Sequence, residues 1–189
     1  MVWLNAFSLV SYSALLHGDA GADTITTGAG SDTVKGGTGN DTIVAAGNLS
    51  AADALDGGDG TDTLSVTNAS LTAMQALSIS EANSFNSSFT SVEGLLVTDA
   101  LDSTGDDFDL GYLAGITTVT LAADVNGAQT LTGFDSGDTL ALSAALTAGV
   151  TPTVNSSASG SADVLNISLT EGADADYNAL TIANVETIN

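Results

Sequence analysis

The sequence has no cysteine, and a single lysine or arginine faces 23 acidic residues among its 189. The absence of cysteine excludes disulfides, thiolate metal sites and cysteine nucleophiles. The formal net charge is −22. Nucleic-acid backbones and anionic membrane surfaces are bound through Lys and Arg, so both are excluded as partners.

The chain is nevertheless rich in apolar residues, which make up 43% of it. Disorder requires high charge together with low hydrophobicity, so a folded state is expected. Charge of one sign destabilises a compact fold, and almost no base is present to offset it. Bound metal is the remaining counterion, and carboxylate oxygens suit Ca²⁺ best. Composition therefore indicates an extracellular calcium protein.

The N-terminal segment 1–17 is apolar but lacks the basic region and the cleavage site of a secretory signal peptide. It is also too short to span a bilayer. We expect it to cap one end of the fold as a strand or a short helix, because solenoid ends need caps.

A nine-residue repeat follows this segment. Residues 18–26, 27–35, 36–44 and 57–65 place Gly, Asp and a branched aliphatic residue at fixed positions. The spacing between Asp41 and Asp62 is not a multiple of nine, and it is explained if 45–47 are an insertion and 48–56 a degenerate unit. Five half-coils with one bulge after the third are predicted.

Each part of this unit has a physical role. Glycines at the first, second and fourth positions are expected to supply positive φ and to let carbonyl groups crowd a cation. The Asp closes the turn, and the middle residue of the strand that follows points inward. Two units form one coil, so turns stack on their second neighbours: Asp23 with Asp41, Asp41 with Asp62, and Asp32 with Asp53. The predicted calcium ligands and turn glycines are Gly18, Gly21, Asp23, Gly28, Gly30, Asp32, Gly36, Gly37, Gly39, Asp41, Asp53, Gly57, Gly58, Asp59, Gly60 and Asp62.

These repeats resemble the repeats-in-toxin (RTX) nonapeptide GGxGxDxUx, a calcium-binding parallel β-helix motif. Two units depart from it, with Asp19 and Thr27 in glycine positions, and the unit around Asp53 has lost its glycines. The resemblance implies a β-roll that binds several Ca²⁺ ions.

Short strands are expected in the rest of the chain, at 62–67, 89–97, 116–123, 129–143, 163–168 and 180–188. Two of these segments contain a Val-Glu step, at Val92-Glu93 and at Val185-Glu186. A helix is expected over 70–82 and a weaker one over 142–149. Composition predicts a loop over 155–162.

This second part resembles the lattice-forming region of Gram-negative surface-layer (S-layer) proteins that carry the same nonapeptides. The resemblance rests on segments such as TLTGFDSGDTL and ANVETIN. It implies type I secretion, a place at the cell surface, and lipopolysaccharide anchoring through another region. The chain carries no convincing secretion signal, which favours a piece of a longer protein or a small relative with a different end.

The predicted fold is all-β: a right-handed parallel β-roll or β-solenoid with short irregular strands and one or two short helices. Its expected parts are an N-terminal cap over 1–17, the calcium-binding roll over 18–65, and an irregular solenoid over 66–189 that continues the roll.

Few residues of the sequence could support catalysis. His17 is the only histidine, no nucleophile-elbow motif is present, and the carboxylates fall in turns without an aromatic sugar platform. We therefore expect no enzymatic activity. Lys35 is expected to face water, and core packing is expected for Trp3, Phe7 and Tyr12.

Two further acidic groups leave alternatives open. A cluster of Asp99, Asp102, Asp106, Asp107 and Asp109 is a solvated loop or a further calcium site, and Asp135 with Asp138 is a weaker case of the same kind.

The leading functional hypothesis is a structural, extracellular, calcium-dependent β-solenoid. It self-assembles into an S-layer or similar surface array, as a homo-oligomer or polymer bridged by calcium. The alternative is a monomeric, calcium-folded carrier module of a type I-secreted enzyme or adhesin. No nucleic-acid binding and no membrane insertion are expected.

Overall fold

The fold was analysed in a computed structural model, which describes residues 3–5, 12–45, 49–101, 107–125, 129–144, 150–154, 163–169 and 180–189. The chain divides into two compact units. Unit 1 comprises 1–96 with 112–116, and unit 2 comprises 97–111 with 117–189.

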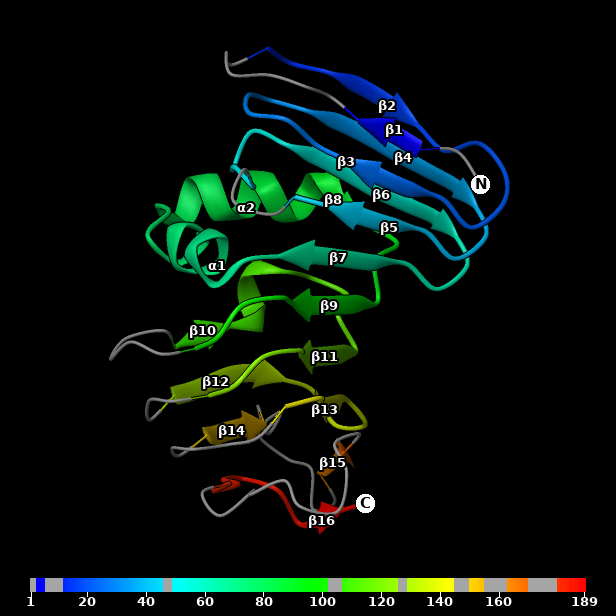
Figure 1. Cartoon of the computed structure of the whole chain (residues 1–189). Coiled ribbons are helices and arrows are strands. Elements are labelled where there is room, and N and C mark those ends of the chain that lie inside the picture. The colour runs from blue at the N-terminus through cyan, green and yellow to red at the C-terminus, as the bar shows by residue number, and fades with distance from the viewer. Residues whose placement is uncertain are drawn as a thin grey trace. The chain divides into compact units, whose positions relative to one another are not determined.

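Unit 1 is a roll of parallel strands in two rows (Figure 1). One row consists of β1 (Trp3–Asn5), β3 (Thr24–Thr26), β5 (Thr42–Val44), β7 (Thr63–Val66) and β9 (Gly94–Val97). The other consists of β2 (Leu15–His17), β4 (Thr33–Thr38), β6 (Ala54–Asp59) and β8 (Phe89–Thr90). The chain alternates between the rows, so each strand pairs with its second neighbour. The predicted parallel β-roll is confirmed.

The register follows the nonapeptide spacing and its single interruption. Ile25 pairs with Ile43 across one regular coil. Ile43 then pairs with Leu64, three residues beyond a regular coil. The same step of 21 separates Val34 from Leu55. The turn between β5 and β6 therefore absorbs the insertion, as the spacing predicts, although residues 46–48 lie outside the described part.

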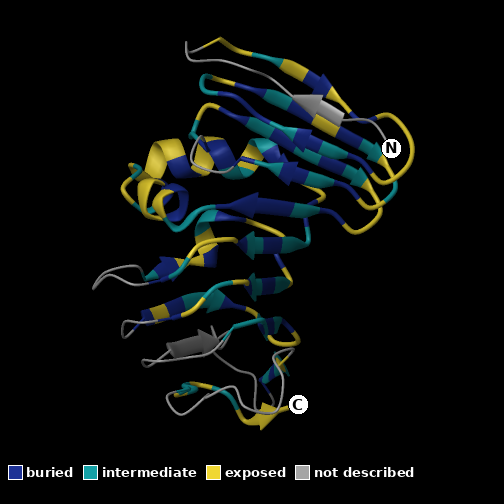
Figure 2. Ribbon diagram, in the orientation of Figure 1, coloured by how far each residue is buried: buried dark blue, intermediate teal, exposed yellow. Residues whose placement is uncertain are grey.

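The core of the roll in unit 1 includes the residue two places after each repeat aspartate. These side chains are at most 1% exposed, as predicted for the inward position (Figure 2). They are Ile25, Val34, Ile43, Leu55 and Leu64. Burying a side chain of this size stabilises the fold by about 1.5–3 kcal/mol. The flanking threonines are only half buried, as expected for a strand with one wet face.

Two helices follow β7: α1 (Asn68–Gln75) and α2 (Ile79–Ser88). The single helix expected over 70–82 is therefore wrong in its middle. Ser78 interrupts it, because its backbone is extended and its side chain caps α2 in a reciprocal capping box with Glu81.

The helices lie at the end of the roll opposite the turns that carry Asp23, Asp41 and Asp62 (Figure 1). Leu71, Met74 and Phe85 are their most buried apolar side chains, and the Phe85 ring stacks on Phe89 of β8 with centroids 5.5 Å apart. The two helices are inserted between β7 and β8 without breaking the coil, because β8 still pairs in register with β6.

Unit 2 also consists of parallel strands in two rows. One contains β11 (Thr118–Leu121), β13 (Thr139–Leu142), β15 (Val164–Leu169) and β16 (Thr187–Ile188). The other contains β10 (Phe108–Asp109), β12 (Gln129–Phe134) and β14 (Val150–Val154). A short 3-10 helix, η1 (Leu110–Tyr112), follows β10. The predicted strands are present, mostly in shorter form.

The weaker helix expected over 142–149 is not formed where the structure describes that range. Leu142 ends β13, and residues 143–144 are not helical. Alternating burial along β13 gives Leu140 and Leu142 a place in the core that a helix would not provide. Residues 145–149 and the loop expected over 155–162 lie outside the described part.

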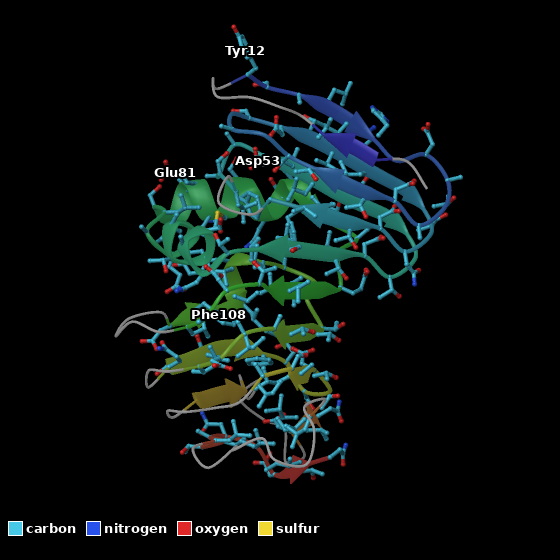
Figure 3. The ribbon with its side chains drawn as sticks, viewed as in Figure 1. Tyr12, Asp53, Glu81 and Phe108 are labelled. Carbon is cyan, nitrogen blue, oxygen red and sulfur yellow. The ribbon has the colours of Figure 1, made fainter. Side chains whose placement is uncertain are left out.

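The predictions for single side chains near the N-terminus have mixed outcomes. Lys35 is exposed, as predicted. Core packing is wrong for Tyr12, which is 70% exposed and points away from the strands (Figure 3). It precedes β2, which is the terminal strand of its sheet among the described strands. Phe7 lies outside the described residues. Within the described ranges, neither helix has the length and the apolar run needed to cross a membrane.

Replacing Leu64 by Ala should destabilise the roll by about 2–5 kcal/mol, because it leaves a cavity between two fully paired coils. Urea denaturation in millimolar calcium measures the loss. Ile79→Ala is the matched control: Ile79 is also an apolar residue of unit 1 but is 83% exposed, so its loss should change stability by less than about 0.5 kcal/mol. Equal losses would contradict the assignment of the core.

Candidate metal centre

Three turns of the nonapeptide type stack at one end of the roll. They run over 18–23, 36–41 and 57–62, and each ends in an aspartate that leads into β3, β5 or β7. Because these strands pair in register, Asp23, Asp41 and Asp62 form a row, called the aspartate row below. The stacking predicted from the spacing is confirmed.

In Asp41 and in Asp62, one carboxylate oxygen joins two neighbouring coils. Oδ1 of Asp41 accepts a hydrogen bond from the backbone N–H of Asp23 at 2.8 Å, and Oδ1 of Asp62 accepts from that of Asp41 at 2.6 Å. The residue after each aspartate adds a backbone bond: Thr42 N–H donates to Asp23 O at 2.8 Å. Charge-assisted bonds of this kind are stronger than neutral ones.

The second carboxylate oxygen has no such donor. Asp41 is 1% exposed and Asp62 is 0% exposed, and Oδ2 of each is buried without a hydrogen-bond partner. A buried charged oxygen left unsatisfied is costly, so it requires a proton or a cation.

A glycine cradle lies beside each of these oxygens. A β-carbon added to Gly36 would collide with the carbonyl oxygen of Gly57 and lie 2.5 Å from Oδ2 of Asp41. The two oxygens thus converge on space that only glycine leaves open. The cradle of Gly18 is similar, with the carbonyl oxygen of Gly36 as its neighbour.

The glycines differ from the sequence expectation at one position. First-position Gly18, Gly36 and Gly57 do not have positive φ. They are needed for close approach, since a side chain would displace the carbonyl group of the next coil. Fourth-position Gly39 does have the expected conformation, with φ of +119°.

The ligand set is therefore mainly backbone. Among the described residues, no three His, Cys, Asp or Glu side chains converge. One carboxylate oxygen with carbonyl oxygens is a hard, all-oxygen environment, which suits Ca²⁺ and not a thiophilic metal. The residues present fit calcium.

Comparison with known proteins agrees with this geometry. A family model, described as the RTX calcium-binding nonapeptide repeat in four copies, matches residues 13–47 and 50–65. The chain carries RTX calcium-binding repeats. Such repeats bind Ca²⁺ ions and are typical of secreted proteins. No curated protein and no solved structure matches the chain.

Carboxylates of the aspartate row and nearby acids repel one another, and a bound cation must offset this repulsion. Burial raises the pKa of the Asp62 carboxyl, and the carboxylates of Asp41, Glu93 and Asp56 raise it further, against the opposing hydrogen bond from the backbone of Asp41. A divalent cation beside Oδ2 would favour the ionised form and reverse this effect.

The opposite row is built differently. Oδ1 of Asp53 accepts from Asp32 N–H at 2.8 Å, as in the aspartate row. Oδ2 of each aspartate, however, accepts a hydrogen bond from a backbone N–H of its own turn. Oδ2 of Asp53 accepts from Ser50 N–H at 2.8 Å, and Oδ2 of Asp32 accepts from Gly28 N–H at 3.1 Å. An ion here would have to share oxygens already bonded. The calcium roles predicted for Gly28, Gly30, Asp32 and Asp53 stay predictions, as does that of Asp59, whose side chain is exposed.

Ser91 and Glu93 join the aspartate row, which the sequence reasoning did not foresee. Oε2 of Glu93 accepts from Asp62 N–H at 2.9 Å, and Gly94 N–H donates to Asp62 O at 2.8 Å. Ser91 has φ of +53°, rare outside glycine. The repeated Val-Glu step was the available signal.

The same bonds recur in unit 2. Oε2 of Glu186 accepts from Asp163 N–H at 2.9 Å, and Thr187 N–H donates to Asp163 O at 3.0 Å. Asn184 has φ of +59°, two residues before Glu186 as Ser91 is before Glu93. Oδ2 of Asp163 is also buried without a partner. The two Val-Glu steps are therefore one structural device used twice.

Several members of the two other acidic groups accept backbone hydrogen bonds, and their calcium role stays a prediction. Asp107 accepts a short hydrogen bond from Thr130 N–H, and Asp109 accepts from Gly111 N–H at 3.0 Å. Asp102 and Asp106 lie outside the described residues. Oδ2 of Asp138 accepts from Asp135 N–H at 2.6 Å, which closes its turn. Burial raises the pKa of Asp138 to about 6.

Asp41→Asn should weaken calcium binding at least about tenfold, because the amide can still accept from Asp23 N–H but no longer carries the charge on Oδ2. Titration of β-structure with calcium, followed by circular dichroism, measures the shift. Asp124→Asn removes the same charge from an exposed site in unit 2 and should leave the midpoint unchanged. A shift in both variants would indicate a general charge effect instead.

Asp138 should make unit 2 less stable as pH rises from about 4 through 6, because its pKa of about 6 in the folded protein exceeds the ordinary aspartic acid value of 3.8. The folded protein holds this proton more tightly, and the advantage disappears above the folded pKa. Asp138→Asn removes the effect. The free energy of unfolding of the wild type, relative to the variant, should fall by up to about 2 kcal/mol between pH 4 and 7 at constant calcium. A difference independent of pH would contradict the raised pKa.

Proposed function

We propose that the chain is a structural, non-catalytic module of the cell exterior, which folds when it binds calcium and assembles with copies of itself into an S-layer or similar surface array. The observation that carries the proposal is the aspartate row. Asp41 and Asp62 are fully buried and carry an oxygen without a donor, in a chain with one basic residue.

Calcium dependence of folding follows from this charge balance. The cradles exist only when neighbouring coils are stacked, so metal binding energy becomes folding energy. Extracellular calcium modules work at about 10⁻⁴–10⁻³ M. The module would therefore remain unfolded at low calcium inside the cell and fold after export. Secretion by the type I route is part of the proposal.

The N-terminal end of unit 1 supports self-assembly. Among the described strands, β2 is the terminal one of its sheet; Leu15 on it is 66% exposed, and Tyr12, three residues earlier, is 70% exposed. Edge strands pair with other chains unless Lys, Pro or a covering segment prevents it. β2 contains neither Lys nor Pro.

Calcium bridging between subunits would use exposed acids such as Asp19 and Asp59. The row aspartates are enclosed within their own chain. The same enclosure favours the second candidate function, a monomeric carrier module that folds with calcium after secretion. Anchoring to lipopolysaccharide is proposed only through another region.

Negative-stain electron microscopy in millimolar CaCl₂ and in EGTA, with circular dichroism on both samples, tests the proposal. We expect β-structure and ordered sheets or filaments only with calcium. Leu15→Lys should abolish assembly but keep the calcium-dependent spectrum, because it places a charge on the open edge. Ile79→Lys, at an 83% exposed site on α2, is the matched control.

Calcium-dependent β-structure without assembly would favour the carrier module. Assembly that survives Leu15→Lys would exclude the β2 edge as the contact. No response of the spectrum to calcium would refute the whole proposal.

A further inference from the structure

A third glycine cradle lies beyond the last nonapeptide. A β-carbon added to Gly57 would collide with the carbonyl oxygen of Ser91 and lie 2.5 Å from Oδ2 of Asp62. This is the arrangement found at Gly36, with Ser91 in place of the next first-position glycine. The family match ends at residue 65, so Ser91 lies outside it.

Strand register explains how a residue so distant occupies that place. Leu55 pairs with Phe89 and Asp56 with Thr90, so the next step along the coil sets Ser91 over Gly57. The chain between them leaves the roll as α1 and α2 and returns in register. Ser91 adopts φ of +53° on its return. A strained backbone conformation of this kind clusters at active sites and ligand sites.

Glu93 takes the place that the aspartate has in a nonapeptide repeat. From Gly57 the chain takes five steps to Asp62, but from Ser91 it takes two steps to Glu93. The longer glutamate side chain spans the shorter turn, and Oε2 reaches Asp62 N–H at 2.9 Å. Oδ1 of Asp62 makes the equivalent bond to Asp41 N–H.

The charge at this cradle is buried. Asp62 is 0% exposed, Oδ1 is used by Asp41, and Oδ2 has no hydrogen-bond partner. Oδ2 lies against the same space as Ser91 O. A convergent carbonyl and an unsatisfied carboxylate oxygen suit a hard divalent cation.

We propose that Oδ2 of Asp62 and the carbonyl oxygen of Ser91 bind a further Ca²⁺ ion, which continues the aspartate row past the nonapeptides. This site rests on the calcium binding of the proposed function and adds a role to it. The ion ties β8 and β9 to the repeats, so that the coil closes again after the helical insertion only when calcium is present.

Anomalous diffraction from crystals of the full chain grown in CaCl₂, with data collected at long wavelength, tests the site directly. We expect one peak beside Gly36, between Asp41 and Gly57, and another beside Gly57, between Asp62 and Ser91. A peak at Gly36 without one at Gly57 would overturn this inference alone. No peak at either cradle would refute calcium binding by the row and the proposed function with it.

Ion counting by native mass spectrometry gives an independent answer in solution. Asp62→Asn keeps the acceptor for Asp41 N–H and should bind one ion fewer than the wild type. Asp41→Asn should also lose one, the double variant two, and Asp124→Asn none. A full count in Asp62→Asn, beside a loss in Asp41→Asn, would overturn the site. The diffraction experiment decides if the variant fails to fold, because it uses the wild type.

Discussion

The structure of unit 1 depends on a buried aspartate that serves two partners. One carboxylate oxygen accepts the backbone N–H of the aspartate one coil away, at 2.6–2.8 Å in the aspartate row. The other faces a glycine cradle. The first bond fixes the distance between coils, and that distance sets the cradle. Register, the inward aliphatic residues and the metal centre therefore depend on the same side chain.

This arrangement explains the near absence of bases. A Lys or Arg beside Asp41 or Asp62 would satisfy the second oxygen without calcium. In the proposed function, leaving these oxygens without a cationic side chain makes folding depend on calcium. Burial and neighbouring acids raise the pKa of Asp62, which is the repulsion that calcium offsets.

The two ends of the roll obey different constraints. At the aspartate row each turn must place a carbonyl oxygen over a cradle, so its turns stay short and keep their glycines. At the other end Asp32 and Asp53 bond to their own turns. That end accepts changes in length, and it contains both the three-residue insertion and the helices α1 and α2.

The sequence by itself determined the roll and most of the metal centre, because a nine-residue period gives the pairing of Asp23, Asp41 and Asp62 by arithmetic. It also identified the inward residues, since a strand alternates its two faces. Only the tertiary structure could decide three points: that first-position glycines avoid a collision, that Ser78 divides the predicted helix, and that Ser91 and Glu93 extend the row. Ser91 and Glu93 follow an insertion of more than twenty residues, so no local period connects them to Asp62. Their place is set by the pairing of β6 with β8, a contact between segments far apart in the chain.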